Sequence, residues 1–149
     1  MRQKKTYDLV LISLLIAVEL VLMFTPLGYI PLGVIRATTL HIPVILAGIV
    51  LGYKGGMSVG LVFGLTSVLI NTMTPTATSF VFSPFYSIGG VSGNFMSLVI
   101  AIVPRVLLGA IAAFIYQLLK RTKKQTFAVV FASLLSTIAH TALVLGGIY

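Results

Sequence analysis

Four ionisable side chains lie within or at the ends of long apolar runs of this 149-residue sequence. They are Glu19, His41, Arg105 and His140. Charged groups are costly in an apolar environment, so such side chains usually face a cavity or a partner. Arg105 offers the most specific chemistry, because its guanidinium can hold a carboxylate or a phosphate through two parallel hydrogen bonds. The structural alternatives for Arg105 are an ion pair with Glu19 and capping of a backbone carbonyl where Pro104 removes a donor.

The two histidines indicate a polar pocket rather than a metal centre. His41 stands in the run 38–43, where a histidine often orders a loop by hydrogen bonding. His140 ends a stripe of small residues and has Thr137 and Thr141 beside it, so we expect it to face inward and to line a polar pocket. Two histidines without a cluster of acids or cysteines do not make a metal site. The chain has no cysteine and no P-loop motif, so the sequence predicts no metal site and no ATP hydrolysis by this chain.

One short motif raises an enzymatic alternative. Residues 90–93 read Gly-Val-Ser-Gly, the short pattern of rhomboid intramembrane proteases, and His140 is a candidate partner for Ser92. A Ser–His pair is the minimum for nucleophilic catalysis. Against this hypothesis, Ser92 falls in a glycine-rich loop, and the glycine spacing expected after the histidine is missing.

The composition places these residues in a membrane protein. Ten basic and two acidic residues make up only 8% of the chain, hydrophobic residues make up 58%, and the mean hydropathy is +1.14. Soluble domains devote about a quarter of their residues to charge. The composition therefore excludes a cytosolic globular domain, a disordered tail and a nucleic-acid-binding module, although the net charge is +8.

The apolar runs predict an all-α, polytopic transmembrane bundle that forms a single membrane domain over residues 1–149. A span needs about 20 apolar residues. The predicted helices, five in all, cover residues 9–28, 39–53, 56–72, 95–119 and 126–147. The connection over 73–94 is uncharged and rich in Ser, Thr, Gly, Pro and aromatic residues, which is typical of a loop that packs over a site.

The basic residues predict the orientation of the bundle. They cluster before the first helix, at Lys54 and over residues 120–124, and alternating topology puts all three groups on one side. By the positive-inside rule that side, with the N-terminus, is cytoplasmic. Arg36 and the 73–94 connection then face outward, which leaves Arg36 and Arg105 as the two arginines of functional interest.

Small residues recur at four-residue spacing, which lets helix backbones approach closely in lipid. The longest series consists of Gly48, Gly52, Gly56, Gly60 and Gly64. Ser13 and Ala17 make a shorter pair on the first helix. Packing within the bundle is the simpler interpretation for most of these residues, and at least one such face is a candidate for docking a partner subunit.

Several longer strings resemble the S components of energy-coupling factor (ECF) vitamin transporters. They are IPLGVIRATTLHIPVILAGIVLGYKGG at 30–56, GLVFGLTS at 60–67, FSPF at 82–85, GN at 93–94, VPRVLLG at 103–109, the basic run at 120–124 and TALVLGGIY at 141–149. The strings cover nearly the whole chain in the family's order, and their combination is more specific than any one of them.

The resemblance implies a multi-pass subunit of a bacterial cell membrane that captures a water-soluble vitamin near the outer face. Family members associate with an ECF module, a transmembrane coupling subunit plus two ATPase subunits, so ATP is hydrolysed by partners and no cofactor is expected in this chain. A small-xxx-small pair on the first helix is the family's docking element, and Ser13 with Ala17 fits it. Family members usually have six helices, so we expect that this sequence is truncated before the sixth.

Within the family, the runs 38–43 and 104–109 are most similar to members assigned to pantothenate. The candidate substrate-binding residues are Arg105, Asn94, Tyr86, His140, Thr141, His41 and Arg36. Pantothenate is a small acid with amide and hydroxyl groups, which these side chains would suit. Folate and riboflavin are the alternative ligands, because related motifs occur in S components of several specificities.

Overall fold

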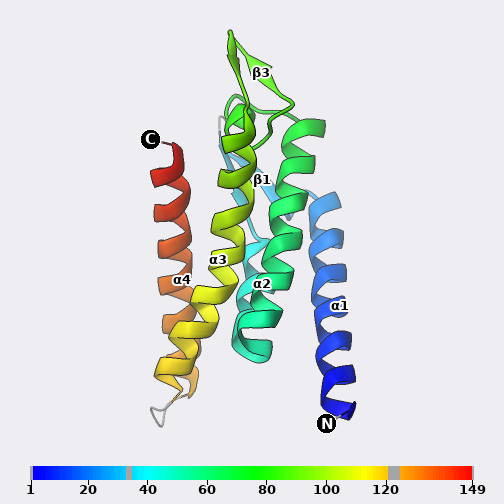
Figure 1. Ribbon diagram of the computed structural model, residues 1–149, viewed down its shortest axis with the longest axis vertical. Helices are drawn as coiled ribbons and strands as arrows, with labels where there is room; N and C mark the ends of the chain where they lie inside the picture. The colour runs from blue at the N-terminus through cyan, green and yellow to red at the C-terminus, as the bar shows by residue number, and fades with distance from the viewer. Residues whose placement is uncertain (1, 33–34, 121–124, 149) are drawn as a thin grey trace.

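The computed structural model describes residues 2–32, 35–120 and 125–148, and the predicted all-α bundle is confirmed. The elements in chain order are α1 (Arg2–Phe24), β1 (Tyr29–Leu32), β2 (Ile35–Thr38), α2 (His41–Met73), the 3₁₀ turn η1 (Ser79–Val81), β3 (Ser87–Ile88), β4 (Val91–Ser92), α3 (Phe95–Leu119) and α4 (Gln125–Ile148). The long helices run along the long axis of the molecule, and the antiparallel hairpins β1–β2 and β3–β4 lie toward the end opposite the N-terminus (Figure 1).

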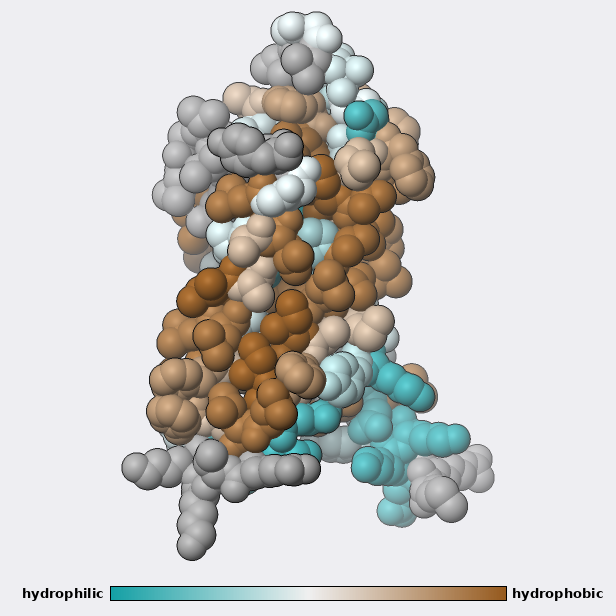
Figure 2. Space-filling view, turned by 60° about the vertical axis from the view of Figure 1, so that its left-hand side comes forward, coloured by the Kyte–Doolittle hydropathy of each residue, from teal (hydrophilic) through white to brown (hydrophobic). Residues whose placement is uncertain are grey.

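The surface of the bundle has the banding of a membrane protein. In the described residues, four helices are long and apolar enough to cross a bilayer. Hydrophobic residues cover most of the helix surface in view, and hydrophilic residues gather at the end that holds the N-terminus (Figure 2). Large apolar side chains such as Leu9, Leu14 and Val21 of α1 are exposed, as expected where lipid replaces water as the solvent.

The first helix ends earlier than the predicted residue 28, because Pro26 cannot continue it. A residue before proline is pushed out of the helical region, and proline itself has no N–H to donate to the carbonyl of Leu22. That oxygen instead accepts from the backbone N–H and the hydroxyl of Thr25, at 3.1 and 3.0 Å. Gly28 then passes so close to the same carbonyl that a methyl group there would overlap it. The chain thus turns directly from α1 into β1.

The predicted count of five helices is not confirmed, because the segments expected at 39–53 and 56–72 belong to one element, α2. Gly52 interrupts it with φ 74° and ψ −160°, a conformation that glycine adopts far more readily than other residues. The rings of His41 and Phe63 lie 5.2 Å apart, whereas a straight helix would separate these residues by about 33 Å. Therefore α2 folds back on itself at Gly52, close to the turn expected at Lys54.

The two halves of α2 pack on α3 through glycines, which confirms the packing interpretation for most of the glycine series. We call this contact the glycine interface, and it consists of Gly48, Gly56, Gly60, Gly64 and Gly109. A methyl group on any of these five residues would overlap backbone atoms of a neighbouring segment. Gly56 and Gly109 meet each other directly, and Gly60 lies against the backbone carbonyl of Arg105. The backbone that carries Arg105 is therefore fixed by direct contact with α2.

Candidate functional site

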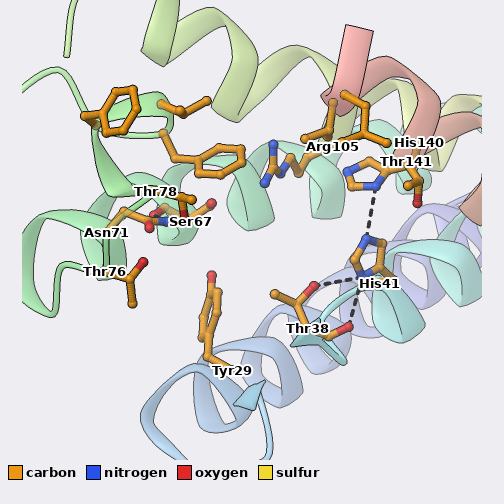
Figure 3. Close-up of a pocket in the computed structure, with 15 residues that line it drawn as sticks. Tyr29, Thr38, His41, Ser67, Asn71, Thr76, Thr78, Arg105, His140 and Thr141 are labelled. Carbon is orange, nitrogen blue, oxygen red and sulfur yellow. Dashed lines mark hydrogen bonds between the residues drawn. The ribbon is translucent and has the colours of Figure 1, made fainter. Parts of the chain in front are cut away.

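A cavity of about 500 Å³ lies between the hairpin β1–β2, both halves of α2, the 73–94 connection, α3 and α4 (Figure 3). Its lining residues are Tyr29, Thr38, His41, Ser67, Asn71, Thr76, Thr78, Phe80, Val81, Phe82, Arg105, His140, Thr141, Val144 and Leu145. The lining combines one cation, two imidazoles and several hydroxyls and an amide with aromatic and aliphatic surface. This mixture is typical of a site for a small polar molecule.

Arg105 is positioned by the proline that precedes it. Pro104 lies inside α3 and has no N–H to donate to the carbonyl of Ile100, four residues earlier. Nη1 of Arg105 donates to that carbonyl at 2.8 Å instead. The carbonyl-capping alternative for Arg105 is therefore confirmed. The bond fixes one edge of the guanidinium, and the side chain lines the cavity.

Aromatic rings cover the guanidinium of Arg105, but no carboxylate neutralises it in the part of the chain that the structure describes. Its Cζ lies 4.9 Å from the ring centroid of Phe82 and 5.7 Å from that of Phe63, within the range of cation–π attraction. The side chain is only 7% exposed, and its Nε has no hydrogen-bond partner. Arg105 is thus a buried cation whose charge is not balanced by a described residue.

Glu19 does not supply the missing negative charge. Its side chain is fully buried at the contact of α1 with α2, where Oε1 accepts from the hydroxyl of Thr66 at 3.4 Å and Oε2 has no hydrogen-bond partner. No ion pair joins it to Arg105 among the described contacts, so the ion-pair alternative from the sequence is not supported.

The two histidines form a pair on the cavity wall. Nε2 of His41 lies 3.1 Å from Nδ1 of His140, and the rings meet edge to face (Figure 3). Nδ1 of His41 lies 2.9 Å from the hydroxyl of Thr38 and 3.1 Å from the backbone carbonyl oxygen of Thr38. His41 therefore does order the end of the β1–β2 hairpin, as its position in the run 38–43 predicts. It also connects that hairpin to α4.

The 73–94 connection supplies another wall of the cavity and is tied to the end of α2. Ser79 is fully buried, and its hydroxyl donates to Oδ1 of Asn71 and accepts from the backbone N–H of Thr76, each at 2.8 Å. The hydroxyls of Thr72 and Ser83 lie 2.7 Å apart. These bonds hold the segment that carries Phe82 in place over the guanidinium.

Tyr29 reaches the cavity from β1. Its hydroxyl lies near Thr66, Ser67 and Arg105 but meets none of them with hydrogen-bonding geometry. Burial raises the pKa of Tyr29 to about 12. The phenol is therefore neutral at physiological pH and can both donate and accept a hydrogen bond.

The structure brings only part of the predicted site together. The predicted residues that line the cavity are Arg105, His140, Thr141 and His41. Arg36 lies in β2 opposite Pro31, and its side chain is outside the part of the chain that the structure describes.

Asn94 and Tyr86 are not among the residues that line the cavity. Oδ1 of Asn94 caps α3, where it accepts from the backbone N–H of Met96 at 2.9 Å and of Ser97 at 3.3 Å. The backbone carbonyl of Tyr86 accepts from the N–H of Gly93 at 2.9 Å, at the base of the β3–β4 hairpin. Both residues thus have a local structural part.

Sequence reasoning missed several lining residues that come together only in the fold. Tyr29 and Phe82 lie in connecting segments whose side chains give no sign of their direction. Ser67 and Asn71 did carry a signal, because two polar residues four apart in an apolar helix share one face. The buried face of α2 that they mark is the face that lines the cavity.

The structure does not assemble the Ser92–His140 pair that protease chemistry would need. Ser92 is exposed in β4, opposite Ser87, in the hairpin that extends beyond the helices (Figure 1). His140 is buried beside His41 and Phe63, and no hydrogen bond described by the structure joins it to Ser92. In the described ranges no group of three or more His, Cys, Asp or Glu side chains is placed to hold a metal ion.

Comparison with known proteins identifies the class to which this bundle and its cavity belong. The family model described as "ECF transporter, substrate-specific component" matches residues 7–149. The chain belongs to this family. One curated relative is the pantothenic acid transporter PanT of Lactococcus lactis subsp. cremoris (strain MG1363). It is 35% identical over 153 aligned residues, which span 100% of this chain and 76% of the relative.

Family membership confirms the resemblance that the sequence strings carry. The chain is a transport protein, not an enzyme, and a multi-pass protein of the cell membrane. It is a substrate-specific component, and such a component works in association with an ECF module.

Proposed function

We propose that this chain binds pantothenate at the outer face of the membrane for ATP-driven uptake by an ECF module. The observation that carries the proposal is the buried, unbalanced cation of Arg105 on the wall of the cavity. The similarity to a pantothenic acid transporter supports this ligand. Arg105 holds the carboxylate of the ligand in this account.

The guanidinium of Arg105 is buried, and no described carboxylate lies beside it on the cavity wall. A buried charge without a counter-charge is strongly unfavourable, and a bound carboxylate removes much of that cost. One edge of the guanidinium already bonds the carbonyl of Ile100, and Nε has no partner. Charge-assisted hydrogen bonds from the remaining N–H groups are about twice as strong as neutral ones. An anionic ligand is therefore favoured over a neutral one.

The remaining lining matches a small acid with hydroxyl and amide groups. The cavity volume of about 500 Å³ lies within the roughly 300–1,000 Å³ of small-molecule sites. Polar groups that can meet hydroxyls or an amide come from Ser67, Asn71, Thr76 and Thr141, and apolar surface comes from aliphatic side chains and from the rings of Phe80 and Phe82. Folate and riboflavin, the alternative ligands, are larger and carry planar ring systems.

Equilibrium binding to the purified protein in nanodiscs tests the ligand. Radiolabelled pantothenate is expected to bind saturably, and unlabelled pantothenate is expected to displace it while folate and riboflavin do not. Saturable binding of folate or riboflavin without binding of pantothenate would overturn the substrate assignment. Family membership would stand in either case.

The charge distribution supports a cytoplasmic N-terminus. Lys4 and Lys5 lie at the start of α1, Lys54 lies beside the reversal of α2, and Lys120 lies at the end of α3. These element ends gather at one end of the bundle, the end with the hydrophilic surface (Figures 1 and 2). The positive-inside rule makes that end cytoplasmic, and the hairpin end with the cavity then faces outward.

The ECF module docks on α1 in this account, through Ser13 and Ala17. Both residues are exposed on the helix surface. The hydroxyl of Ser13 donates to the backbone carbonyl of Leu9 in the same helix. Two small side chains at this spacing leave room for close packing of a partner helix. Ala17→Leu is expected to abolish copurification of a coupling subunit and two ATPase subunits while pantothenate binding persists. Ala142→Leu on α4 is the matched control, since Ala142 is also exposed. Equal copurification of both variants would contradict docking through α1.

A further inference from the structure

We infer that the His41–His140 pair is held in one tautomeric form, which leaves Nε2 of His140 as a hydrogen-bond acceptor for the ligand. The site then selects an anion that also carries an O–H or N–H donor. This inference rests on the proposed function for the identity of the ligand, but the tautomer itself is inferred from contacts within the protein alone.

The first step is the proton on His41. Its Nδ1 lies 3.1 Å from the carbonyl oxygen of Thr38. A carbonyl oxygen can only accept, so this contact is a hydrogen bond only when Nδ1 carries the proton. The hydroxyl of Thr38, at 2.9 Å, accepts from Nδ1 in that tautomer and donates to it in the other. We assign the proton to Nδ1 because only this tautomer satisfies both contacts with Thr38. In a neutral imidazole with a proton on Nδ1, Nε2 is an acceptor.

The second step transfers this assignment to His140. Nε2 of His41 lies 3.1 Å from Nδ1 of His140, and because the first nitrogen accepts, the second must donate. The remaining nitrogen of His140, Nε2, then carries a lone pair. It is buried and has no hydrogen-bond partner in the described structure, although His140 belongs to the lining of the cavity.

Both imidazoles are neutral in this arrangement because their surroundings disfavour a further positive charge. His41 and Phe63 pack against the His140 ring, and Arg105, already a cation, lines the same cavity. No carboxylate borders the cavity in the residues described. A second buried charge would have no compensating partner there.

The cavity is thus lined by two side chains that each have a buried nitrogen without a hydrogen-bond partner, one a donor and the other an acceptor. Nε of Arg105 is a donor without an acceptor, and Nε2 of His140 is an acceptor without a donor. Figure 3 shows the His140 ring next to Arg105 and joined to His41, and all three side chains line the cavity. A ligand with a carboxylate and a nearby hydroxyl or amide N–H satisfies both. A site with an unpaired buried acceptor rejects analogues that lack the donor, because the acceptor loses its bond to water without a replacement.

The tautomer can be observed directly. The chain contains only two histidines, so ¹⁵N-histidine labelling of the wild-type protein in nanodiscs gives two assignable imidazoles. The inference predicts a protonated Nδ1 and an unprotonated Nε2 in both rings, with a coupling from His140 Nδ1–H to His41 Nε2. A proton on Nε2 of His140 would overturn it. This result does not depend on which vitamin binds.

Binding then tests the selectivity. Pantothenate is compared with three analogues, each lacking one of its two hydroxyls or its amide N–H. In the wild-type protein at least one analogue is expected to bind about tenfold more weakly, as for the loss of one buried hydrogen bond. His140→Asn keeps a donor at the Nδ1 position but has no atom at Nε2, so that tenfold difference should vanish. His140→Gln keeps an acceptor near Nε2 and should retain part of it. An unchanged difference in His140→Asn would overturn the inference, whereas absence of pantothenate binding to the wild type would overturn the proposed function alone.

Discussion

The two sides of the cavity are built in different ways. On the side of α2 and α3, backbones touch directly through the glycine interface. The backbone carbonyl of Arg105 itself lies against Gly60. On the side of α4, the described hydrogen bond to another element is the one between His140 and His41. The first contact admits almost no change of shape. On the second side α4 packs along α3, but its hydrogen-bonded link to the start of α2 is made by two side chains.

The two sides therefore have different parts in ligand recognition. The rigid side holds the fixed charge, and electrostatic recognition needs a fixed charge if binding is not to spend free energy on ordering it. The α4 side holds the acceptor whose partner is the ligand itself. Changes at the glycine interface should therefore affect folding first, and changes on the α4 side should affect ligand selectivity first.

The largest expected effect is a failure of the glycine interface. Gly109→Ala would place a methyl group into the backbone of Gly56, and overpacking between two backbones is expected to lower the free energy of unfolding by about 3 kcal/mol. Thermal unfolding in nanodiscs measures the loss as a lower midpoint. An unchanged midpoint would mean that the close approach of α2 and α3 is absent.

A smaller effect is expected from breaking the link to α4. His41→Phe keeps an aromatic ring beside Phe63 but removes the hydrogen-bonding contacts of the imidazole with Thr38 and His140. Loss of these bonds leaves Nδ1 of His140 without its described partner and is expected to lower the free energy of unfolding by about 1–2 kcal/mol. Accelerated hydrogen exchange in α4, with little change in α3, would locate the effect. Equal acceleration in both helices would contradict the proposed division.

A still smaller effect should separate a cap from a ligand contact. Asn94→Ala removes the acceptor at the start of α3 and is expected to destabilise the protein by about 1 kcal/mol. Pantothenate affinity should stay within a factor of two of wild type, since Asn94 does not line the cavity. Asn94→Ser restores a cap and should restore stability. A large loss of affinity in both variants would return Asn94 to the binding site.

The smallest effect serves as the control for glycine substitution. Gly146 in α4 has nothing within 4 Å of an added methyl group. Gly146→Ala is expected to leave stability unchanged or to raise it by up to about 1 kcal/mol, because alanine is the better helix former. Destabilisation comparable to that of Gly109→Ala would show that the glycine interface is not special.

Periodic features of the chain were predictable from its sequence. The four-residue spacing of glycines predicted close helix packing, and the apolar runs predicted the long helices with α3 at 95–119. A reversal was expected at Lys54 and Gly55, and the break in helical geometry falls close by, on Gly52, where a positive φ turns the chain between the two helical halves of α2. Backbone geometry of this kind has no composition signal of its own.

The candidate site was predictable only where a residue type is costly in lipid. Arg105, His41 and His140 were identified because an ionisable group in an apolar run needs a reason to be there. Tyr29 and Phe82 were missed because tertiary folding alone brings their segments over the cavity. Asn94 was predicted as a ligand contact from the family resemblance, and the sequence does not distinguish a polar residue that caps the next helix from one that binds a solute.

The central claim is that Arg105 holds the carboxylate of pantothenate, and a binding cycle tests it most directly. Pantothenate and its uncharged alcohol analogue, in which the carboxylate is replaced by CH₂OH, are each titrated against wild type and Arg105→Gln in nanodiscs. A charged hydrogen-bonded contact contributes about 1.5–3 kcal/mol, so wild type should prefer pantothenate by roughly 10- to 150-fold. Arg105→Gln should bind the two compounds within a factor of three of each other. A variant that folds and keeps the full preference for pantothenate would contradict the account.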